Sequence, residues 1–459
     1  MIRKASIALR AIAVSYFKVP LFVRILIAFV LGSLIGLVCC SLLPPDSINP
    51  TVAFLTPFGT VLISLLKMVV FPIILFSLIA GAASLPLKQS GRLGLSVIAW
   101  YFFTSVFATI FGIGLALFLN PQMKSFSGQT EQIGSGVTAS DEYSSNIGGL
   151  TEFFPTLFQN PFAALARGDF LPIIIFSIVV GLAARFVLDS SRSSDEERKN
   201  VSLAISVCKG CQTISFKIID WIIEYFPIGV FALSFTNFAI SGVELFGPYL
   251  RIVLCVVVGT CAMTFLIYPL AIYVFCRENP FRTLSQLKLP ILTAFTTRSS
   301  AATLTVSMQT ANKLGIASSL SSFSLPLGCT VNMDGVCVHL PVFVILASNV
   351  FGVPITFHEL LVLSISVVFA SIGAGGIPGG SVFLLYMILE NAGFTPAQVS
   401  AIVGLAIGVN PLLDMFETAC NVTGDNVCTY IIARRNQLLT PPSILKRSKR
   451  DPGSSLDQV

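Results

Sequence analysis

Six long apolar runs, separated by short charged or Pro/Gly-rich stretches, are the feature that most constrains this chain. They cover residues 20–44, 52–86, 93–119, 169–189, 201–238 and 245–276. Each supplies the roughly 20 residues that a helix needs to cross the hydrocarbon core of a bilayer. The composition agrees, because 54% of the 459 residues are apolar and 11% are charged, against about 25% charged in soluble domains. The runs predict an all-α polytopic membrane protein and exclude a secreted domain or a disordered scaffold.

The distribution of Lys and Arg predicts the orientation in the membrane. The short loops 88–92, 192–199 and 277–282 are basic or mixed, whereas the polar insert 120–160 has Lys124 as its only cation. We therefore expect these loops and both termini in the cytoplasm and the insert outside, in a bacterial inner membrane. The net charge of +6 reflects this orientation, so no nucleic-acid partner is predicted.

Two segments rich in Gly, Pro, Ser and Thr interrupt the apolar pattern, at 293–303 and 370–381. Each is expected to form the tip of a re-entrant hairpin, because unpaired backbone at membrane depth is tolerated only where protein or water satisfies it. A helix with a polar cluster follows each tip, at 330–335 and 414–425. Paired interrupted segments of this kind indicate a transporter with its binding site near the bilayer midplane.

The second polar cluster places several oxygen-bearing side chains on one helix face. Asp414, Thr418, Asn421 and Asp425 follow steps of four, three and four, with Glu417 beside them. Carboxylates within a membrane are costly unless they are paired, neutralised or hydrated. We therefore interpret this face as part of a binding site rather than as a solvated charge stripe.

The first polar cluster adds oxygen ligands of other kinds. Asn332 and Asp334, next to Gly335, offer an amide oxygen, a carboxylate and freed backbone carbonyls. Such ligands suit a small hard cation, so a cation site is predicted and a transition-metal site is not. Thr104 and Ser105 offer hydroxyls, but helix hydroxyls usually bond to their own backbone.

Other polar residues are less informative. Arg298 is the only cation of the first tip, and two roles are open for it: an ion pair with a carboxylate, or binding of a substrate carboxylate. We expect both histidines, His339 and His358, to lie outside the polar clusters. With no nucleophile and base at a suitable spacing, the chain is not expected to be an enzyme.

Four motifs, in order and at suitable distances, resemble the glutamate transporter family of dicarboxylate/amino acid:cation symporters. They are residues 298–304, 332–335, the Gly/Pro tip 371–380 and the stretch 414–425. The resemblance runs from about residue 20 to 435. It implies eight transmembrane helices plus two re-entrant hairpins, an elevator mechanism and a homotrimer.

The resemblance also implies a division of the chain. The expected parts are a cytoplasmic N-terminus 1–19, scaffold helices 20–92 and 161–244, a transport domain 93–119 and 245–435, the extracellular insert 120–160 and a cytoplasmic tail 436–459.

Sodium and substrate sites are implied at the positions that match the family motifs. The sodium ligands, as side chains or backbone oxygens, would be Tyr101, Thr104, Ser105, Gly328, Thr330, Asn332, Asp334, Ser371, Ile372, Ala374, Asn421 and Asp425. The substrate site would comprise Arg298, Ser299, Ser300, Val336, Gly379, Gly380, Ser381, Asp414, Glu417, Thr418 and Asn421. In it Asp414 would accept the substrate amine, and Ser300 and Asn421 would hold the α-carboxylate. The second tip, with its glycines and Pro378, would close as a lid.

Two positions depart from the members that carry glutamate and aspartate. Those members have an Arg where this chain has Glu417 and a Thr where it has Val336. A Glu repels a distal carboxylate by roughly 4 kcal/mol at about 4 Å and an effective dielectric constant of about 20. The expected substrate is therefore a neutral or amine-bearing amino acid, with an acidic amino acid, a dicarboxylate or cystine as alternatives.

A rival account has Glu417 paired with Arg298 or protonated by burial, which would leave a neutral pocket. A protonated Glu417 would also allow coupling to H⁺, so the proton stays open beside sodium as the coupling ion. An ion channel, the other class considered, would need a ring of ligands repeated by symmetric subunits. This chain instead has one asymmetric cluster.

Overall fold

The computed structural model describes residues 19–84, 91–119, 155, 157–167, 170–372, 376 and 379–440. Within them the regular structure is helical, apart from one isolated antiparallel bridge between Ile316 and Leu439. The N-terminal segment 1–18, the tail from 441 and residues 120–154 of the insert lie outside the described residues.

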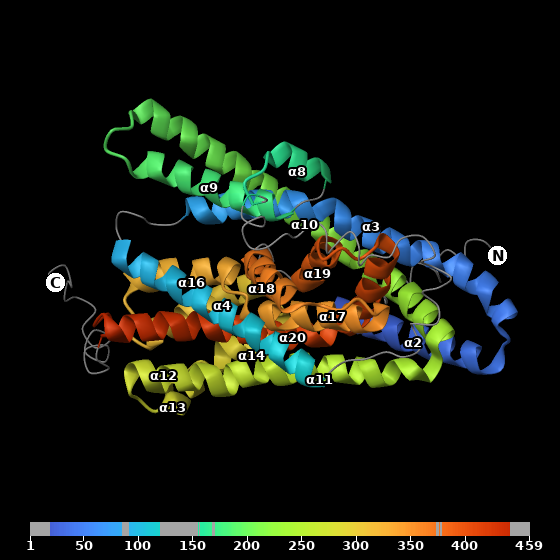
Figure 1. Ribbon diagram of the computed structural model, residues 1–459. Helices are drawn as coiled ribbons and strands as arrows, with labels where there is room; N and C mark the ends of the chain where they lie inside the picture. Colours follow the sequence, from blue (N-terminus) through green and yellow to red (C-terminus); the bar gives the residue numbers. More distant parts are fainter. Residues whose placement is uncertain are drawn as a thin grey trace, which may run out of the picture.

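The first elements, labelled as in Figure 1, are α2 (Leu21–Leu42), α3 (Pro45–Ala83), α4 (Gly91–Leu119), α8 (Pro161–Arg167), α9 (Phe170–Asp189), α10 (Asp195–Ser241), the 3₁₀ turn η1 (Gly242–Leu245), α11 (Phe246–Ala262), the π-helical η2 (Met263–Ile267) and α12 (Tyr268–Cys276).

The C-terminal part of the chain consists of shorter helices and one long one. They are α13 (Pro280–Gln286), α14 (Lys288–Thr297), α15 (Ser300–Lys313), α16 (Ser318–Val331), α17 (Asp334–Phe351), α18 (Phe357–Ser371), α19 (Gly380–Asn391) and α20 (Pro396–Arg435).

Seven helical stretches among the described residues are long and apolar enough to cross a membrane. They are Val23–Leu42, Asp46–Ala83, Arg92–Leu119, Leu171–Asp189, Asp195–Cys276, Ser318–Phe351 and Pro396–Arg435. The six predicted apolar runs overlap the first five of these stretches, which confirms an all-helical, multi-pass membrane protein. The stretch Asp195–Cys276 contains α10 as well as α11, η2 and α12, with η1 between them.

The spans differ in how much of them the protein covers. In α2, 22% of the most apolar window is buried, whereas the shares are 83% in α16–α17 and 72% in α20. Mean hydropathy runs the other way, at 2.7 for α2 and 1.7 for both of the buried stretches. Helices that face lipid must be apolar, while buried helices can direct polar side chains toward one another.

The helices pack in two groups. In the first, α10 lies against α2 and α3, and α9 packs on α3. In the second, α20 is surrounded by α11, α14, α16, α17 and α19, and α4 lies along α17 and α11. Figure 1 shows α20 running through the middle of the second group, with α3 and α9 above it in this view. Contacts of α20 with α10 and α3, and of α3 with α19, join the two groups.

A capping box sets the start of α20. The Thr395 hydroxyl accepts the Gln398 N–H, and the Gln398 side chain accepts the Thr395 N–H, which satisfies two backbone donors at the helix end. Pro396 occupies the first turn, where its missing N–H costs nothing. From this start α20 continues for 40 residues to Arg435, so the whole polar cluster 414–425 lies on one uninterrupted helix.

The first predicted tip is a break of only two residues. α14 ends at Thr297, Arg298 adopts a left-handed conformation with φ of 54°, and α15 starts at Ser300. The side chain of Ser299 caps α15 by accepting a hydrogen bond from the Ala302 N–H at 3.2 Å. The predicted range 293–303 is therefore too long, because Thr hydroxyls at 293–297 bond to carbonyls of the preceding turn and stay helical.

The second predicted tip, at 370–381, contains the end of α18 and the start of α19. α18 ends at Ser371, and α19 starts at Gly380 after Gly379, whose φ of 76° only glycine adopts readily. Residues 373–375 and 377–378, which include Ala374 and Pro378 of the predicted lid, lie outside the described residues.

Candidate functional site

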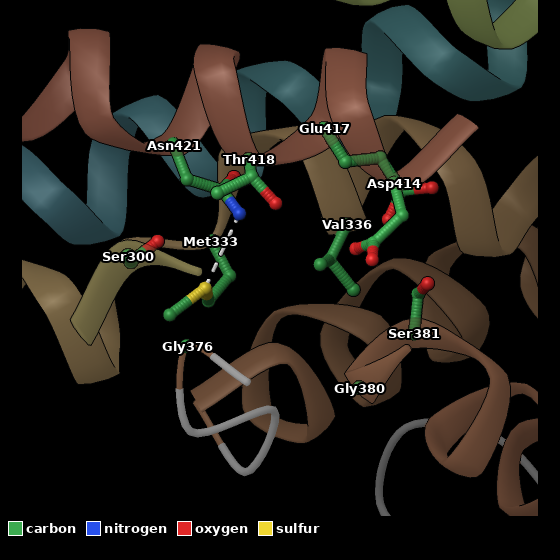
Figure 2. Close-up of a pocket in the computed structure, with 10 residues that line it drawn as sticks. All are labelled: Ser300, Met333, Val336, Gly376, Gly380, Ser381, Asp414, Glu417, Thr418 and Asn421. Atoms are coloured by element: carbon green, nitrogen blue, oxygen red, sulfur yellow. Dashed lines mark hydrogen bonds between the residues drawn. The ribbon is translucent and has the colours of Figure 1, made fainter. Parts of the chain in front are cut away.

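A pocket lies where both helix breaks meet α17 and α20 (Figure 2). Its lining residues are Ser300, Met333, Val336, Gly376, Gly380, Ser381, Asp414, Glu417, Thr418 and Asn421. Eight of these ten are among the predicted substrate residues, and the other two are Met333 and Gly376. The structure thus brings together residues from α15, α17, α19 and α20 around one pocket.

Asp414 connects the pocket to both tips. Its Oδ2 accepts the backbone N–H of Gly379 at 3.0 Å and lies 4.0 Å from Nη1 of Arg298. Of the two roles open for Arg298, this geometry supports an ion pair with a carboxylate. At 4.0 Å the pair is long for a charge-assisted hydrogen bond, so Asp414 retains capacity to accept a further donor.

The two tips touch each other beside the pocket. The Ser299 hydroxyl donates to the Gly376 carbonyl oxygen at 3.2 Å. Gly376 has a φ of 63°, and a Cβ there would lie 2.6 Å from the Cys329 carbonyl oxygen, so only glycine fits. The next residue, Ser300, is 2% exposed, and its hydroxyl has no hydrogen-bond partner among the described residues. A buried hydroxyl in this state requires a partner from a ligand or water.

Gly335 brings the start of α17 into contact with α20. A Cβ at Gly335 would lie 2.5 Å from the carbonyl oxygen of Glu417. Its backbone N–H donates to Asn421 Oδ1 at 2.6 Å, and the Nδ2 of Asn421 lies 3.3 Å from the Met333 sulfur (Figure 2). The absent side chain therefore sets how closely the two pocket walls approach.

The hydrogen-bond partner of Glu417 is His339, a residue expected to lie outside the polar clusters. His339 lies inside the site, with its Nδ1 hydrogen-bonded to Glu417 Oε1, and the two residues are 0% and 1% exposed. The prediction that both histidines lie outside the polar clusters is therefore wrong for His339. The ring of His339 also stacks on Phe343, with centroids 4.8 Å apart.

A second cluster surrounds Asp334. Its Oδ1 accepts the hydroxyl of Ser105 at 2.9 Å, and its Oδ2 accepts the hydroxyl of Tyr268 at 2.6 Å. Asp334 is fully buried and sits at the first position of α17, where a carboxylate interacts favourably with the helix dipole. The hydroxyl of Ser105, which was weak evidence in the sequence, is thus directed at the predicted cation ligand.

Asn332 links this cluster to α20. Its Oδ1 accepts the Thr104 hydroxyl at 3.1 Å, and its Nδ2 donates to Asp425 Oδ1 at 3.1 Å. Asn332 lies in the two-residue break between α16 and α17, with φ of −95° and ψ of 84°, so the break comes before Gly335 rather than at it. The break frees backbone carbonyls next to two buried carboxylates.

Gly328 and Tyr101 border the same cluster. A Cβ on Gly328 would lie 2.4 Å from Asp425 Oδ1 and 2.6 Å from the Tyr101 hydroxyl, so a bare backbone is needed there. The Tyr101 hydroxyl donates to the Ser324 carbonyl oxygen at 2.9 Å. The backbone of α16 is thereby held against the Asp425 carboxylate.

The atoms of this cluster that could coordinate a cation are oxygens. Carboxylates, an amide oxygen and hydroxyls suit a hard cation such as sodium, and a Cβ would fill the space at Gly328. Among the described residues there is no group of three or more His, Cys, Asp and Glu that could hold a metal ion. The residues therefore fit an alkali cation.

The remaining predicted sodium ligands are less tightly grouped. The Thr330 hydroxyl donates to the Leu327 carbonyl at 3.0 Å, and the Ser371 hydroxyl donates to the Val368 carbonyl at 2.8 Å. Ile372 follows the end of α18, and Ala374 lies outside the described residues.

Besides the pocket residues Met333 and Gly376, two residues of the site, Tyr268 and His339, were missed by the sequence analysis. Tyr268 starts α12 after a π-helical stretch inside a predominantly apolar run, so nothing local distinguishes it. His339 had a usable signal, because it lies three residues after Val336 and therefore on the same face of α17.

Comparison with known proteins identifies the group to which these motifs belong. Residues 21–435 match the sodium:dicarboxylate symporter family. The serine/threonine transporter SstT of Bifidobacterium adolescentis is 30% identical over 428 residues, which cover 92% of this chain and 91% of that protein. The neutral amino acid transporter B(0) of Oryctolagus cuniculus is 28% identical over 94% of this chain and 83% of its own length. The Bos taurus protein of the same name is 29% identical over 80% of this chain and 71% of its own length.

Proposed function

Because the chain belongs to the sodium:dicarboxylate symporter family, we propose that it is a sodium-coupled symporter that imports a neutral amino acid. The chain is a multi-pass membrane transporter and not an enzyme. The oxygen atoms around Asp334, Asn332 and Asp425 are called the oxygen cluster below. The observation that carries the proposal is that α17 and α20 each contribute to both the oxygen cluster and the pocket. A cation at Asp334 and Asp425 and a substrate at Asp414 are then linked through the same two helices, so that binding of each changes the affinity for the other.

The residues divide by chemistry within this proposal. Sodium is held by the oxygen cluster around Asp334, Asn332 and Asp425, with hydroxyls from α4. The substrate amine is held by Asp414, which still has capacity to accept a donor. The α-carboxylate is held at the first turn of α15, where helix N–H groups and the unpaired Ser300 hydroxyl favour an anion.

Glu417 favours a neutral substrate over an acidic one. It lines the pocket beside Val336, and among the described residues its side-chain hydrogen-bond partner is the imidazole of His339. A distal carboxylate would meet an acceptor oxygen and an apolar wall instead of the guanidinium that suits it. The names of two relatives, a serine/threonine transporter and a neutral amino acid transporter, support the same substrate class.

The packing supports an elevator mechanism. We assign eight transmembrane helices to α2, α3, α4, α9, α10, α11–α12, α16–α17 and α20, and the two re-entrant hairpins to α14–α15 and α18–α19. The first packing group would be the scaffold of a homotrimer and the second, which holds the site, would move across a bacterial inner membrane, with both chain termini in the cytoplasm.

Uptake into proteoliposomes tests the proposal. Purified protein is reconstituted, and uptake of labelled serine, alanine and aspartate is measured under an inward gradient of sodium, of potassium or of protons. We expect saturable uptake of the neutral amino acids with sodium alone. Uptake driven equally by the proton gradient would replace sodium with H⁺, aspartate as the best substrate would refute the substrate class, and non-saturable flux would indicate a channel.

A further inference from the structure

We propose that His339 is a positioning residue that sets the substrate preference, by holding one oxygen of Glu417 so that the other accepts a hydroxyl from the substrate side chain. The inference rests on the proposed function of the pocket. It extends that function from neutral amino acids in general to those with a single side-chain hydrogen-bond donor.

The two oxygens of Glu417 differ in their surroundings. Oε1 is hydrogen-bonded to Nδ1 of His339, while Oε2 is buried and has no hydrogen-bond partner among the described residues. The Glu417 residue is 1% exposed and lines the pocket, where Figure 2 shows its carboxylate near that of Asp414. An unpaired acceptor at this depth is costly, and a ligand that supplies one donor removes that cost.

His339 is itself held in a fixed orientation. It is 0% exposed, and its ring stacks on Phe343 one turn further along α17. Gly335 keeps α17 against the backbone of α20 at Glu417, which brings the imidazole within reach of the carboxylate. The rigid imidazole therefore selects one orientation of the Glu417 carboxylate.

Counting donors gives the substrate class. A hydroxyl carries one donor, whereas an ammonium carries three. The side-chain end of the pocket offers Glu417 Oε2 as an acceptor next to the apolar Val336, and the Ser381 hydroxyl already donates to Asn410 Oδ1 at 3.1 Å. The side-chain end of the pocket therefore matches an amino acid with one hydroxyl, which pairs with Glu417 Oε2. Alanine would leave Oε2 without a donor, and 2,3-diaminopropionate would leave donors of its side-chain ammonium without an acceptor.

The test measures affinities of the full-length protein in sodium chloride by isothermal titration calorimetry, with serine, alanine and 2,3-diaminopropionate as probes. For the wild type we expect serine to bind about tenfold more tightly than alanine, in line with a hydrogen bond to a carboxylate. In His339→Phe, which keeps a ring to stack on Phe343, we expect most of this preference to be lost while alanine binding changes little. His339→Asn, which can place an amide N–H near the position of Nδ1, is expected to restore it.

Two further variants separate positioning from general damage. His358→Phe changes the only other histidine of the chain and should leave the serine-to-alanine ratio unchanged. In a Glu417→Gln background, adding His339→Phe should lower the ratio by less than about twofold, because the two residues act as a unit.

Several results would overturn the inference. One is a wild type that binds alanine or 2,3-diaminopropionate as tightly as serine, which decides the matter even if His339→Phe does not fold. Another is a serine-to-alanine ratio that His339→Phe leaves intact. Serine binding that keeps its preference over alanine without sodium would refute the coupling in the proposed function and leave this inference standing.

Discussion

The two polar regions on α17 and α20 contain the same kinds of groups but differ in how far the protein satisfies them. Around Asp334, both carboxylate oxygens accept hydroxyl donors, and Asp425 accepts the Asn332 amide. In the pocket, Glu417 Oε2 and the Ser300 hydroxyl are buried without partners among the described residues. The first region is organised by the protein itself, whereas the second has buried polar atoms that a ligand or water would have to satisfy. In the function proposed above, the first region would position a small ion and the second would discriminate between organic molecules.

Removing a carboxylate from the oxygen cluster should have the largest effect. In Asp425→Asn we expect the sodium affinity to fall by roughly 4 kcal/mol, about three orders of magnitude, which is the Coulomb energy of one charge pair at about 4 Å and an effective dielectric constant of about 20. Sodium titrations of serine binding measure this loss. The matched control is Asp220→Asn on the exposed face of α10, which should leave sodium affinity unchanged. Retained sodium affinity in Asp425→Asn would place the ion elsewhere.

Tyr268→Phe tests whether a hydroxyl that donates to Asp334 contributes to sodium binding. It removes the hydroxyl that donates to Asp334 Oδ2 at 2.6 Å. We expect sodium affinity to fall by about 10- to 100-fold, as is typical when a residue that orients a ligand is lost. The ratio of serine to alanine affinity should not change, because Tyr268 does not line the pocket. Tyr273→Phe, an exposed tyrosine on the same helix, is the control, and an equal effect there would remove the special role of Tyr268.

Gly335→Ala is expected to disturb both regions together. The added Cβ would lie 2.5 Å from the Glu417 carbonyl oxygen, so α17 and α20 must separate. Overpacking of this kind costs about 1–3 kcal/mol, and thermal unfolding should show a lower midpoint, with weaker sodium and serine binding. Gly81→Ala on α3 meets no atom within 4 Å and serves as the control, with stability equal to or above the wild type. A loss confined to one ligand would show that the two regions are independent.

The smallest effect is expected far from both regions. Lys67 on α3 forms an ion pair of 3.0 Å with Glu390 on α19, and both side chains are partly exposed. Such pairs contribute about 0.2–1 kcal/mol, so Lys67→Met should lower the unfolding midpoint only slightly and leave both affinities unchanged. A large change in transport rate with unaltered binding would instead show that this contact between the packing groups governs movement.

The lipid-facing part of the fold was predictable because the bilayer dictates its composition. α2 has a mean hydropathy of 2.7 and only 22% of its apolar window is buried, so its sequence alone identifies it. The polar face of α20 was equally visible, since Asp414, Thr418 and Asn421 share a helical spacing and all line the pocket. Apolar composition and helical spacing are both properties of neighbouring residues in one segment, so they can be recognised from a single sequence.

The contacts between helices could not be predicted in the same way. The pairing of His339 with Glu417 joins residues 78 positions apart, and that of Tyr268 with Asp334 joins residues 66 positions apart. Such contacts depend on how closely two helices pack, and at Gly335 this is set by an absent side chain. The left-handed Arg298 illustrates another limit, because it caps the end of α14 in a conformation that its residue type disfavours.

The lengths of the helices have a consequence for the surrounding bilayer. α3, α10 and α20 contain 39, 47 and 40 residues, which correspond to about 60–70 Å at about 1.5 Å per residue. The hydrocarbon layer is about 30 Å thick, so these helices must tilt steeply or project well beyond it. A change in membrane thickness would therefore be met by a change in the tilt of these helices, by their projection or by deformation of the nearby bilayer, each at a modest cost.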